Sequence, residues 1–291
     1  MELPLVVGVD GSDSSLAAVD WAVDEAARHG LPLQLVHASL WEVYEAAQPS
    51  FSTDRPAKEV MAEHIVASCV ERARRRDPEV KVSGRVLAED AVSALLRAGP
   101  EAFALVTGSR GRGEIAGMLL GTVSLEVAAR AVCPVVVVRG AEANRRGAFG
   151  RVVVGVGDAT GGAGAVRFAV REAEVRGCAL TAVRAWRNPA QEPVDHMLIA
   201  DDAARLREER VSTSLEDALR EAVREHPQVD VRRKAVEGTA HKVLLQESAE
   251  ADLIVVGAQR RHGHFGLQLG RVGHTLLHHS DCPVAVVPQP V

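Results

Sequence analysis

The stretch ALVTGSRGRGEIAGMLLGTVSLEVAAR, Ala104–Arg130, joins an apolar start to a helix-periodic end through a run rich in glycine. The glycines between the two parts are Gly108, Gly111, Gly113, Gly117 and Gly121. Glycine lets the backbone adopt positive φ and approach a ligand closely, and the start of a helix offers unpaired N–H groups and the positive end of a dipole to an anion. The stretch therefore predicts a strand, a glycine loop and a helix, which together suit a chain of phosphates.

This loop differs from the common glycine-rich phosphate motifs. A Walker A loop needs a lysine on the phosphates, and no lysine lies between Gly108 and Arg130; G-x-G-x-x-G is also absent. The spacing Gly108-x2-Gly111-x9-Gly121-Thr122 instead resembles the nucleotide-binding signature of the universal stress protein family, G-x2-G-x9-G-[S/T], which wraps the triphosphate in ATP-binding members. The alternative is that the glycines only shape a long loop and that Thr122 caps the helix.

Length and composition bound the class of protein. A chain of 291 residues, 47% hydrophobic and 25% charged, favours about two ordinary globular domains. The net charge of −5 argues against a nucleic-acid binder, and no apolar run approaches a membrane span or a signal peptide. We therefore expect a cytoplasmic protein without nucleic-acid or membrane partners. No C-x-x-C pair occurs, so packed, reduced thiols are expected at Cys69, Cys133, Cys178 and Cys282.

Continuous apolar strands alternate with helical patterns through the first half, which predicts a parallel sheet covered on both faces. The expected strands are residues 3–9, 31–38, 80–86, 104–107 and 133–138, and the expected helices are residues 16–29, 58–76, 91–98 and 123–131. The long segment Ser39–Ala57 fits no element. A lid and a disordered connection are both open interpretations of it.

The pattern then repeats after a linker-like stretch at residues 139–150. Val7-Gly8-Val9 recurs as Val154-Gly155-Val156, and Cys133-Pro134-Val135 recurs as Cys282-Pro283-Val284, at offsets of 147 to 149 residues. The chain is therefore interpreted as a tandem duplication, with a first domain over residues 1–140 and a second over residues 150–291. The resemblance to tandem universal stress proteins covers essentially all of the chain. It implies an α/β fold of two doubly wound, Rossmann-like, five-stranded parallel sheets with strand order 3-2-1-4-5, the adenine nucleotide alpha-hydrolase-like fold.

The first half carries the intact motif and a predicted ligand site. The strand exits at Asp10-Gly11 and Gly108 fall where such a sheet reverses direction, and ligands bind there. The resemblance assigns Asp10 to the nucleoside, although a turn aspartate is the alternative, and the backbone ending at Ala38 to adenine. Arg110 and Arg112 either contact phosphates or are solvated loop charges. The predicted nucleotide-binding residues are Gly8, Val9, Asp10, Ala38, Gly108, Arg110, Gly111, Arg112, Gly113, Gly121, Thr122, Val123 and Ser124. ATP is the expected cofactor, with Mg²⁺ left open and no metal-binding residue assigned.

The second half carries a degenerate motif. It reads Gly257-Ala-Gln-Arg260 and, nine residues later, Gly270-Arg271, so arginine replaces the second glycine and the hydroxyl. Gly157 replaces Asp10, with Asp158 beside it. We predict that the side chains of these arginines fill the corresponding ligand cleft, so that this half does not bind ATP. The alternative is that Arg260, Arg261 and Arg271 bind a different anion.

Five histidines surround this degenerate motif: His262, His264, His274, His278 and His279. His274 and His278 have the i, i+4 spacing of metal ligands on one helix face, but H-E-x-x-H is absent and solvated or capping histidines are favoured. His262-Gly263-His264 is similar to the H-x-G-H of nucleotidyltransferases, yet that motif belongs near a first strand, so it is discounted.

The residues near the glycine loop predict binding better than catalysis. The nearest carboxylates, Asp10 and Glu114, have no spacing suited to water activation, so no catalytic residue is assigned. The favoured function is an ATP-binding regulatory module of the stress response that acts on an unknown protein partner. The alternatives are a slow ATPase or nucleotidyl-transferring enzyme in the same cleft, and a protein-interaction scaffold without nucleotide. The resemblance also implies that the last strands, 135–138 and 284–287, make the halves an intramolecular pseudo-dimer, with a homodimer of whole chains left open.

Overall fold

The computed structural model of the chain describes residues 2–39, 57–111, 120–157, 162–187, 197–259 and 269–289. The chain divides into two compact units, one made mainly of residues 1–139 and one mainly of residues 140–291. Most of the segment Ser39–Ala57, interpreted as either a lid or a disordered connection, lies outside the described part of the chain, at residues 40–56.

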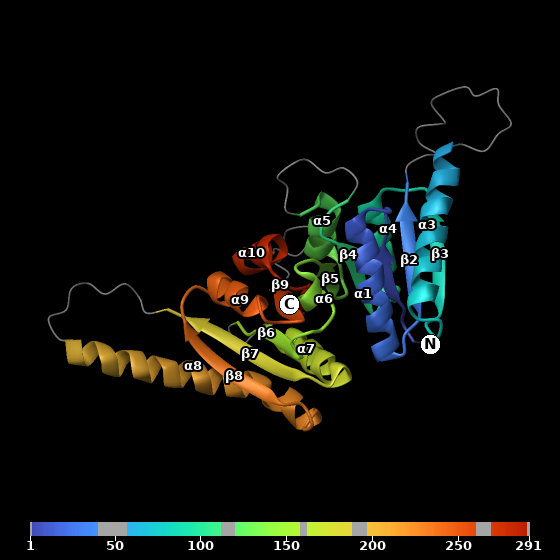
Figure 1. The fold of residues 1–291 in the computed structure, drawn as a ribbon. Coiled ribbons are helices and arrows are strands. Elements are labelled where there is room, and N and C mark those ends of the chain that lie inside the picture. Colours follow the sequence, from blue (N-terminus) through green and yellow to red (C-terminus); the bar gives the residue numbers. More distant parts are fainter. Residues whose placement is uncertain are drawn as a thin grey trace. The chain divides into compact units, whose positions relative to one another are not determined.

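The first unit alternates strands and helices as its sequence predicts (Figure 1). Its strands are β1 (Leu5–Gly8), β2 (Leu33–Ala38), β3 (Val82–Leu87), β4 (Ala104–Gly108) and β5 (Val135–Val138). Its described helices are α1 (Asp13–His29), α3 (Ala57–Arg76), α4 (Ala91–Ala98) and α5 (Thr122–Arg130), with a 3₁₀ turn at Gly99–Glu101.

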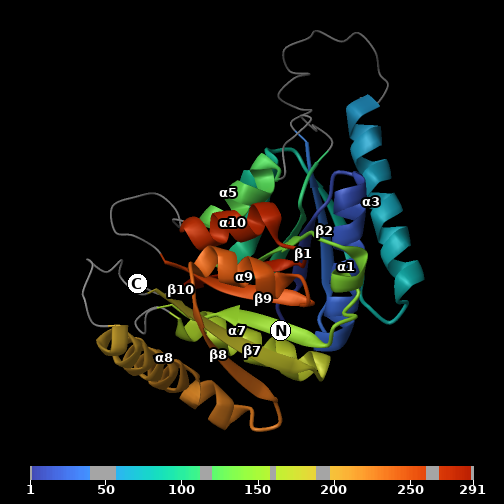
Figure 2. The same cartoon turned by 60° about the vertical axis from the view of Figure 1, so that its left-hand side comes forward.

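The second unit repeats this order (Figure 2). Its strands are β6 (Arg151–Gly155), β7 (Ala179–Trp186), β8 (Val231–Glu237), β9 (Leu253–Gln259) and β10 (Val284–Gln289). Its described helices are α6 (Glu142–Arg145), α7 (Ala163–Arg176), α8 (Met197–Glu225), α9 (Ala240–Ser248) and α10 (Arg271–His279).

Both units contain a doubly wound parallel sheet. The order is β3-β2-β1-β4-β5 in the first unit and β8-β7-β6-β9-β10 in the second, and all pairs within a unit are parallel. Helix α1 packs beside α3 and α4 beside α5, while α7 packs beside α8 and α9 beside α10. Right-handed crossovers in opposite directions from the first strand place the two helix pairs on opposite faces. The predicted strand order 3-2-1-4-5 is confirmed.

The duplication is also visible in how the first helix of each unit ends. Gly30 follows α1 with φ +67°, and Gly177 follows α7 with φ +59°. Each glycine donates its N–H to the last carbonyl groups of its helix in a left-handed conformation that favours glycine. The same local signal therefore stops the chain and turns it into the second strand of each sheet.

The linker-like stretch contains a helix that the sequence pattern did not predict. Asn144 of α6 is 3% exposed. Its side-chain amide donates to the carbonyl groups of Ser248, Ala249 and Ala251 at 3.3, 3.1 and 2.9 Å. These bonds attach the stretch to the second unit, so its polar composition reflects a short anchored helix.

The cores are built from the strands. Every residue of β4 and β5 is buried, and so are most of their counterparts in β9 and β10. All four cysteines are free, and burial raises the pKa of the Cys133 thiol to about 11, which makes it a poor nucleophile. None of the described helices combines the length and apolar character that crossing a bilayer requires.

Candidate functional site

The end of β4 is held against the first turn of α1. A Cβ atom on Gly108 would lie 2.6 Å from the backbone carbonyl group of Ser14. The N–H of Arg110 donates to the Ser14 hydroxyl at 3.1 Å, and the Ser14 and Ser109 hydroxyl oxygens are 3.4 Å apart. Gly108 therefore has a structural reason to be glycine, since any larger residue would push the helix from the strand.

Two loops that are about a hundred residues apart in sequence meet at Asp10 and Gly111. The carboxylate Oδ1 of Asp10 accepts from the N–H and the hydroxyl of Ser12 at 3.0 and 2.6 Å, which fixes the turn before α1. A Cβ atom on Gly111 would lie 2.7 Å from the other oxygen, Oδ2. The loop after β1 and the loop after β4 thus converge at the carboxyl ends of adjacent strands, where ligands bind in open α/β sheets.

Helix α5 begins beside this point and has no side-chain cap. Its first flanking residue, Gly121, donates its N–H to the carbonyl group of Ser109 at 2.8 Å. The nearest described atom to a Cβ on Gly121 would be the Cα of Arg110 at 3.7 Å, an ordinary contact distance. Neither its φ of −73° nor its packing against described residues therefore explains why this residue is glycine. The buried hydroxyl of Ser124 donates to the carbonyl group of Gly108 at 2.7 Å, while Thr122 is exposed.

The predicted residues of β1 and β2 take part mainly in packing. A Cβ on Gly8 would lie 2.9 Å from the Leu95 side chain. Val9 donates its N–H to Val36, and its carbonyl group accepts from Nδ1 of His37 at 2.7 Å. Ala38 ends β2 in register with Leu87 of β3. The backbone groups of Val9 are therefore already engaged within the unit.

Several polar residues at this site were not predicted. Ser12 caps α1 by accepting from the N–H of Ser15, and Ser14 and Ser109 join the two loops. His37 holds the end of β1. The serine cluster after Asp10 was recognisable as a helix start, but its contact with the loop after β4 depends on the sheet order. Arg112 and Gly113 lie outside the described residues, so their predicted roles stay predictions.

The second unit covers the corresponding glycine with a side chain from its last strand. The β9–β10 ladder continues through Val287↔Gly257 to Gln289↔Gln259. The Gln289 side chain, 2% exposed, comes within 3.1 Å of a Cβ placed on Gly257. Its Oε1 accepts from the N–H of Gly164 in the first turn of α7 at 3.1 Å. The space above Gly257 is therefore filled by Gln289, a residue that the sequence analysis did not single out. Gln289 aligns with Gly140 in the first half.

The other predicted residues of the degenerate motif are only partly described. Arg260, Arg261 and Asp158 lie outside the described residues, so the predicted arginine plug stays a prediction. Arg271 is exposed at the start of α10. The carbonyl group of Gly157 accepts a hydrogen bond from the Arg184 side chain at 2.9 Å. In the first unit the carbonyl group of Val9 accepts from His37, which aligns with Arg184.

The histidines of α10 do not form a metal site with other described residues. The His274 and His278 rings are stacked with centroids 6.3 Å apart, which confirms their shared helix face. No group of three described ligand side chains includes either ring. His262 and His264 lie outside the described residues.

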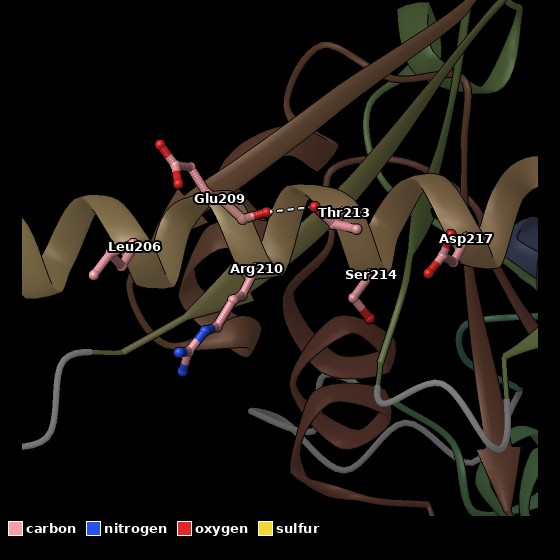
Figure 3. A pocket seen from close by; sticks show the side chains of 6 residues that line it. All are labelled: Leu206, Glu209, Arg210, Thr213, Ser214 and Asp217. Atoms are coloured by element: carbon pink, nitrogen blue, oxygen red, sulfur yellow. Dashed lines mark hydrogen bonds between the residues drawn. The ribbon is translucent and has the colours of Figure 1, made fainter.

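A hollow of about 450 Å³ runs along α8 (Figure 3). All of its described lining residues belong to that one helix: Leu206, Glu209, Arg210, Thr213, Ser214 and Asp217. The Thr213 hydroxyl donates back to the carbonyl group of Glu209 at 2.9 Å, so it serves the helix itself. None of the described residues that line the hollow is a predicted nucleotide-binding residue, so we do not assign it as the site.

Comparison with known proteins identifies the family and the fold of the chain. The universal stress protein family matches residues 3–139 and again residues 148–288. Universal stress protein Rv2005c of Mycobacterium tuberculosis is 34% identical over 290 residues, 98% of this chain and 97% of its own length. A solved universal stress protein from Archaeoglobus fulgidus shares the fold, with a TM-score of 0.69 at 18% identity and 99% of each chain covered. A solved universal stress protein in complex with cAMP is 30% identical and covers 48% of this chain and 98% of its own, with a TM-score of 0.37. The chain therefore belongs to the universal stress protein family, with one copy of the family's domain in each half.

Proposed function

We propose that the first unit binds an adenine nucleotide, ATP in the cell, at the carboxyl ends of β1 and β4. The observation that carries this proposal is the convergence of three features: the Asp10 carboxylate, the backbone of Gly111 and the uncapped start of α5 at Gly121. Polar atoms from separate loops meet there: the backbone of Gly111 lies close to the Asp10 carboxylate, and Gly121 has only ordinary contacts with described atoms.

The residues present fit a nucleotide. The first-turn amides of α5 suit phosphate oxygens, and a helix end contributes about 0.3 to 1 kcal/mol per charge, so several amides must act together. The Asp10 carboxylate, held in place by Ser12, suits a ribose hydroxyl as a hydrogen-bond acceptor. Gly121 supports this assignment best, since a ligand close to the backbone explains a glycine that contacts with described residues leave unexplained.

The same residues favour regulation over turnover. Among the predicted site residues that the structure describes, Asp10 is the only carboxylate, and its hydrogen bonds to Ser12 fix it in a turn. A general base must reach an attacking water, and a turn aspartate already serving as an acceptor is poorly suited to that. We therefore propose a binding module that presents different surfaces to a protein partner with and without nucleotide.

The test compares two glycines at the same motif position. Valine at Gly121 should lower the ATP affinity of the intact chain about 100-fold, roughly 2.7 kcal/mol, because its side chain would occupy the ligand's approach. The same change at Gly270 is the control: it precedes α10 in the same extended conformation, and a Cβ there meets no described atom within 4 Å. Isothermal titration calorimetry with ATP, ADP, AMP and cAMP measures both variants and ranks the nucleotides.

Absence of nucleotide uptake by the unaltered chain, or equal loss of affinity in both variants, would overturn the proposal. A turnover assay with ATP and magnesium in excess separates regulation from hydrolysis. Sustained multiple turnovers would favour the ATPase alternative over the regulatory module.

A further inference from the structure

Each unit has an edge segment made of one helix and one strand. Helix α3 packs beside α1 in the first unit, and α8 packs beside α7 in the second (Figure 1). Each of these helices leads into the edge strand of its own unit's sheet, β3 or β8. Duplicated units can exchange such segments, because each unit offers the other's segment a similar surface.

Apolar packing distinguishes the two edge segments only weakly. The helices align at an offset of 149 residues, so that the buried Val66 and Ala73 of α3 correspond to the buried Leu215 and Ala222 of α8. Strands β3 and β8 also share one pattern of burial, with three exposed residues near the middle. Cores tolerate apolar replacements of similar size, so each segment would find an acceptable apolar surface in the other unit.

Two arginines of α3 bind two aspartates of α1. Arg72 donates from Nε and Nη2 to the two carboxylate oxygens of Asp20, both at 2.6 Å. Arg76 donates in the same way to Asp24, at 2.6 and 2.7 Å, and also lies 3.9 Å from Asp20. These four side chains are between 25% and 45% exposed. Two-pronged pairs of this kind fix geometry as well as energy, and they require opposite charges.

The second unit carries the opposite charges at the same four positions. Asp20 and Asp24 correspond to Arg167 and Arg171 of α7, and Arg72 and Arg76 correspond to Glu221 and Glu225 of α8. Each helix pair is therefore complementary in charge within its own unit. An exchanged pair would instead place acid against acid between α1 and α8, and base against base between α7 and α3.

The next turn of α7 adds to this mismatch. Glu174 lies 2.8 Å from Nδ1 of His226, just after α8, and its carboxylate also accepts from the side chain of Gln228. In the segment after α3 the corresponding residues are Asp77 and Glu79. That segment would bring two further carboxylates to Glu174 if it packed on α7.

We propose that this reversal of charge keeps each edge segment with its own unit while the chain folds. Connectivity alone separates the native and exchanged arrangements weakly, because each doubling of a closed loop changes its population only about threefold. Opposite charges across each native helix pair favour the native arrangement, and like charges across the exchanged pairs oppose the alternative. This device needs no ligand and does not rest on the nucleotide proposed for the first unit.

The test makes the two units alike in charge and follows refolding of the full chain after dilution from urea. One variant gives the first unit the signs of the second: Asp20→Arg, Asp24→Arg, Arg72→Glu and Arg76→Glu. A second variant gives the second unit the signs of the first: Arg167→Asp, Arg171→Asp, Glu221→Arg and Glu225→Arg. In both variants the helix pairs stay complementary within each unit, but the exchanged pairs become complementary as well.

The readout is the fraction of refolded chain that elutes from a sizing column as the unaltered protein does. Hydrogen exchange over residues 13–29, 57–76, 163–176 and 205–225 must also match that protein. In each variant this native fraction should fall to about half of its value in the unaltered chain, because two arrangements of similar complementarity then compete.

The matched control combines all eight substitutions, which exchanges the charge pattern between the units and restores opposite signs. It should refold to the same native fraction as the unaltered chain, although it carries more changes than either variant. An unchanged native fraction in either four-substitution variant would overturn the proposal. A loss in the control as large as in those variants would overturn it too, because the substitutions themselves would then be the cause.

Discussion

In the first unit β4 ends at Gly108 under the first turn of α1, whereas in the second unit β9 runs on to Gln259 and its Gly257 lies under the side chain of Gln289. The two sheets share strand order and glycine position, yet their ligand ends differ. A duplicated fold therefore keeps the position of a strand exit while the residues that cover it change, and that cover affects what could bind there.

The same contrast appears in how the first helix of each unit is capped. Ser12 caps α1 from the adjacent residue, and its oxygen accepts from Ser15 at 3.2 Å. Gly162, the N-cap residue of α7, makes no side-chain cap, and Gln289 accepts from Gly164 across 125 residues of chain. In the first unit the cap of α1 thus comes from Ser12, next to the helix. In the second unit Gln289 of the last strand caps α7 and fills the space above Gly257.

The largest effect is expected from alanine at the two strand-exit glycines. Gly108→Ala should cost about 3 kcal/mol of unfolding free energy, because its Cβ would lie 2.6 Å from the backbone of Ser14, which cannot move without α1. Gly257→Ala should cost about 1 kcal/mol, since it meets a side chain at 3.1 Å that can shift. Urea unfolding gives the costs, and hydrogen exchange by mass spectrometry assigns them to α1 or α7. Equal costs would contradict the contrast.

An intermediate effect is expected from removing the two caps. Gln289→Ala should cost about 2 kcal/mol, because it loses the cap of α7 and leaves a buried gap above Gly257. Ser12→Ala should cost about 1 kcal/mol, the usual value for a local cap. Gln259→Ala, at the exposed end of β9, is the control and should be close to neutral. The measurement is hydrogen exchange in residues 13–16 and 163–166, and unchanged protection of α7 in Gln289→Ala would refute the distant cap.

The smallest effect is expected when the pH is lowered, on the stability of helix α4. Asp90 caps α4 by accepting from the N–H groups of Val92 and Ser93 at 3.1 and 3.0 Å, whereas Thr239 gives α9 no side-chain cap. Hydrogen bonds from the Ser93 side chain and backbone lower the pKa of Asp90. The folded-state pKa is thus below the unfolded one, so the cap's contribution is complete above the unfolded value near pH 4 and is lost as pH falls through the folded value.

This predicts that protection of α4 falls more steeply than that of α9 as the pH falls below about 4. Asp90→Asn keeps an effective capping group but cannot titrate, so it should remove the extra steepness and leave protection at pH 7 almost unchanged. Hydrogen exchange of residues 91–98 and 240–248 provides the comparison. Parallel pH profiles for the variant and the unaltered chain would show that the Asp90 charge does not contribute to the pH dependence of α4 protection.

Local chemistry explains why so much of the fold was predictable. Continuous apolar runs require buried strands, and Gly30 and Gly177 each end a helix through positive φ, so the alternation of strands and helices followed from patterns within short windows. The duplication followed from the recurrence of these patterns, and the strand order from the resemblance to the family. The glycine spacing likewise located a strand exit and a helix start. These signals depend on neighbouring residues in the chain, which is why they can be read without coordinates.

Contacts between distant residues could not be read in that way. The residues beside Gln289 in the sequence do not indicate that its side chain covers Gly257. Local sequence likewise does not indicate that Asn144 anchors the linker helix, or that Arg187 and Arg271 line one pocket. Each depends on which strand ends become neighbours once the sheet forms, and side-chain burial there is a property of the assembled unit. The amino-acid pattern thus established the duplicated α/β fold and the position of the strand exits, whereas three-dimensional packing determined what fills each exit.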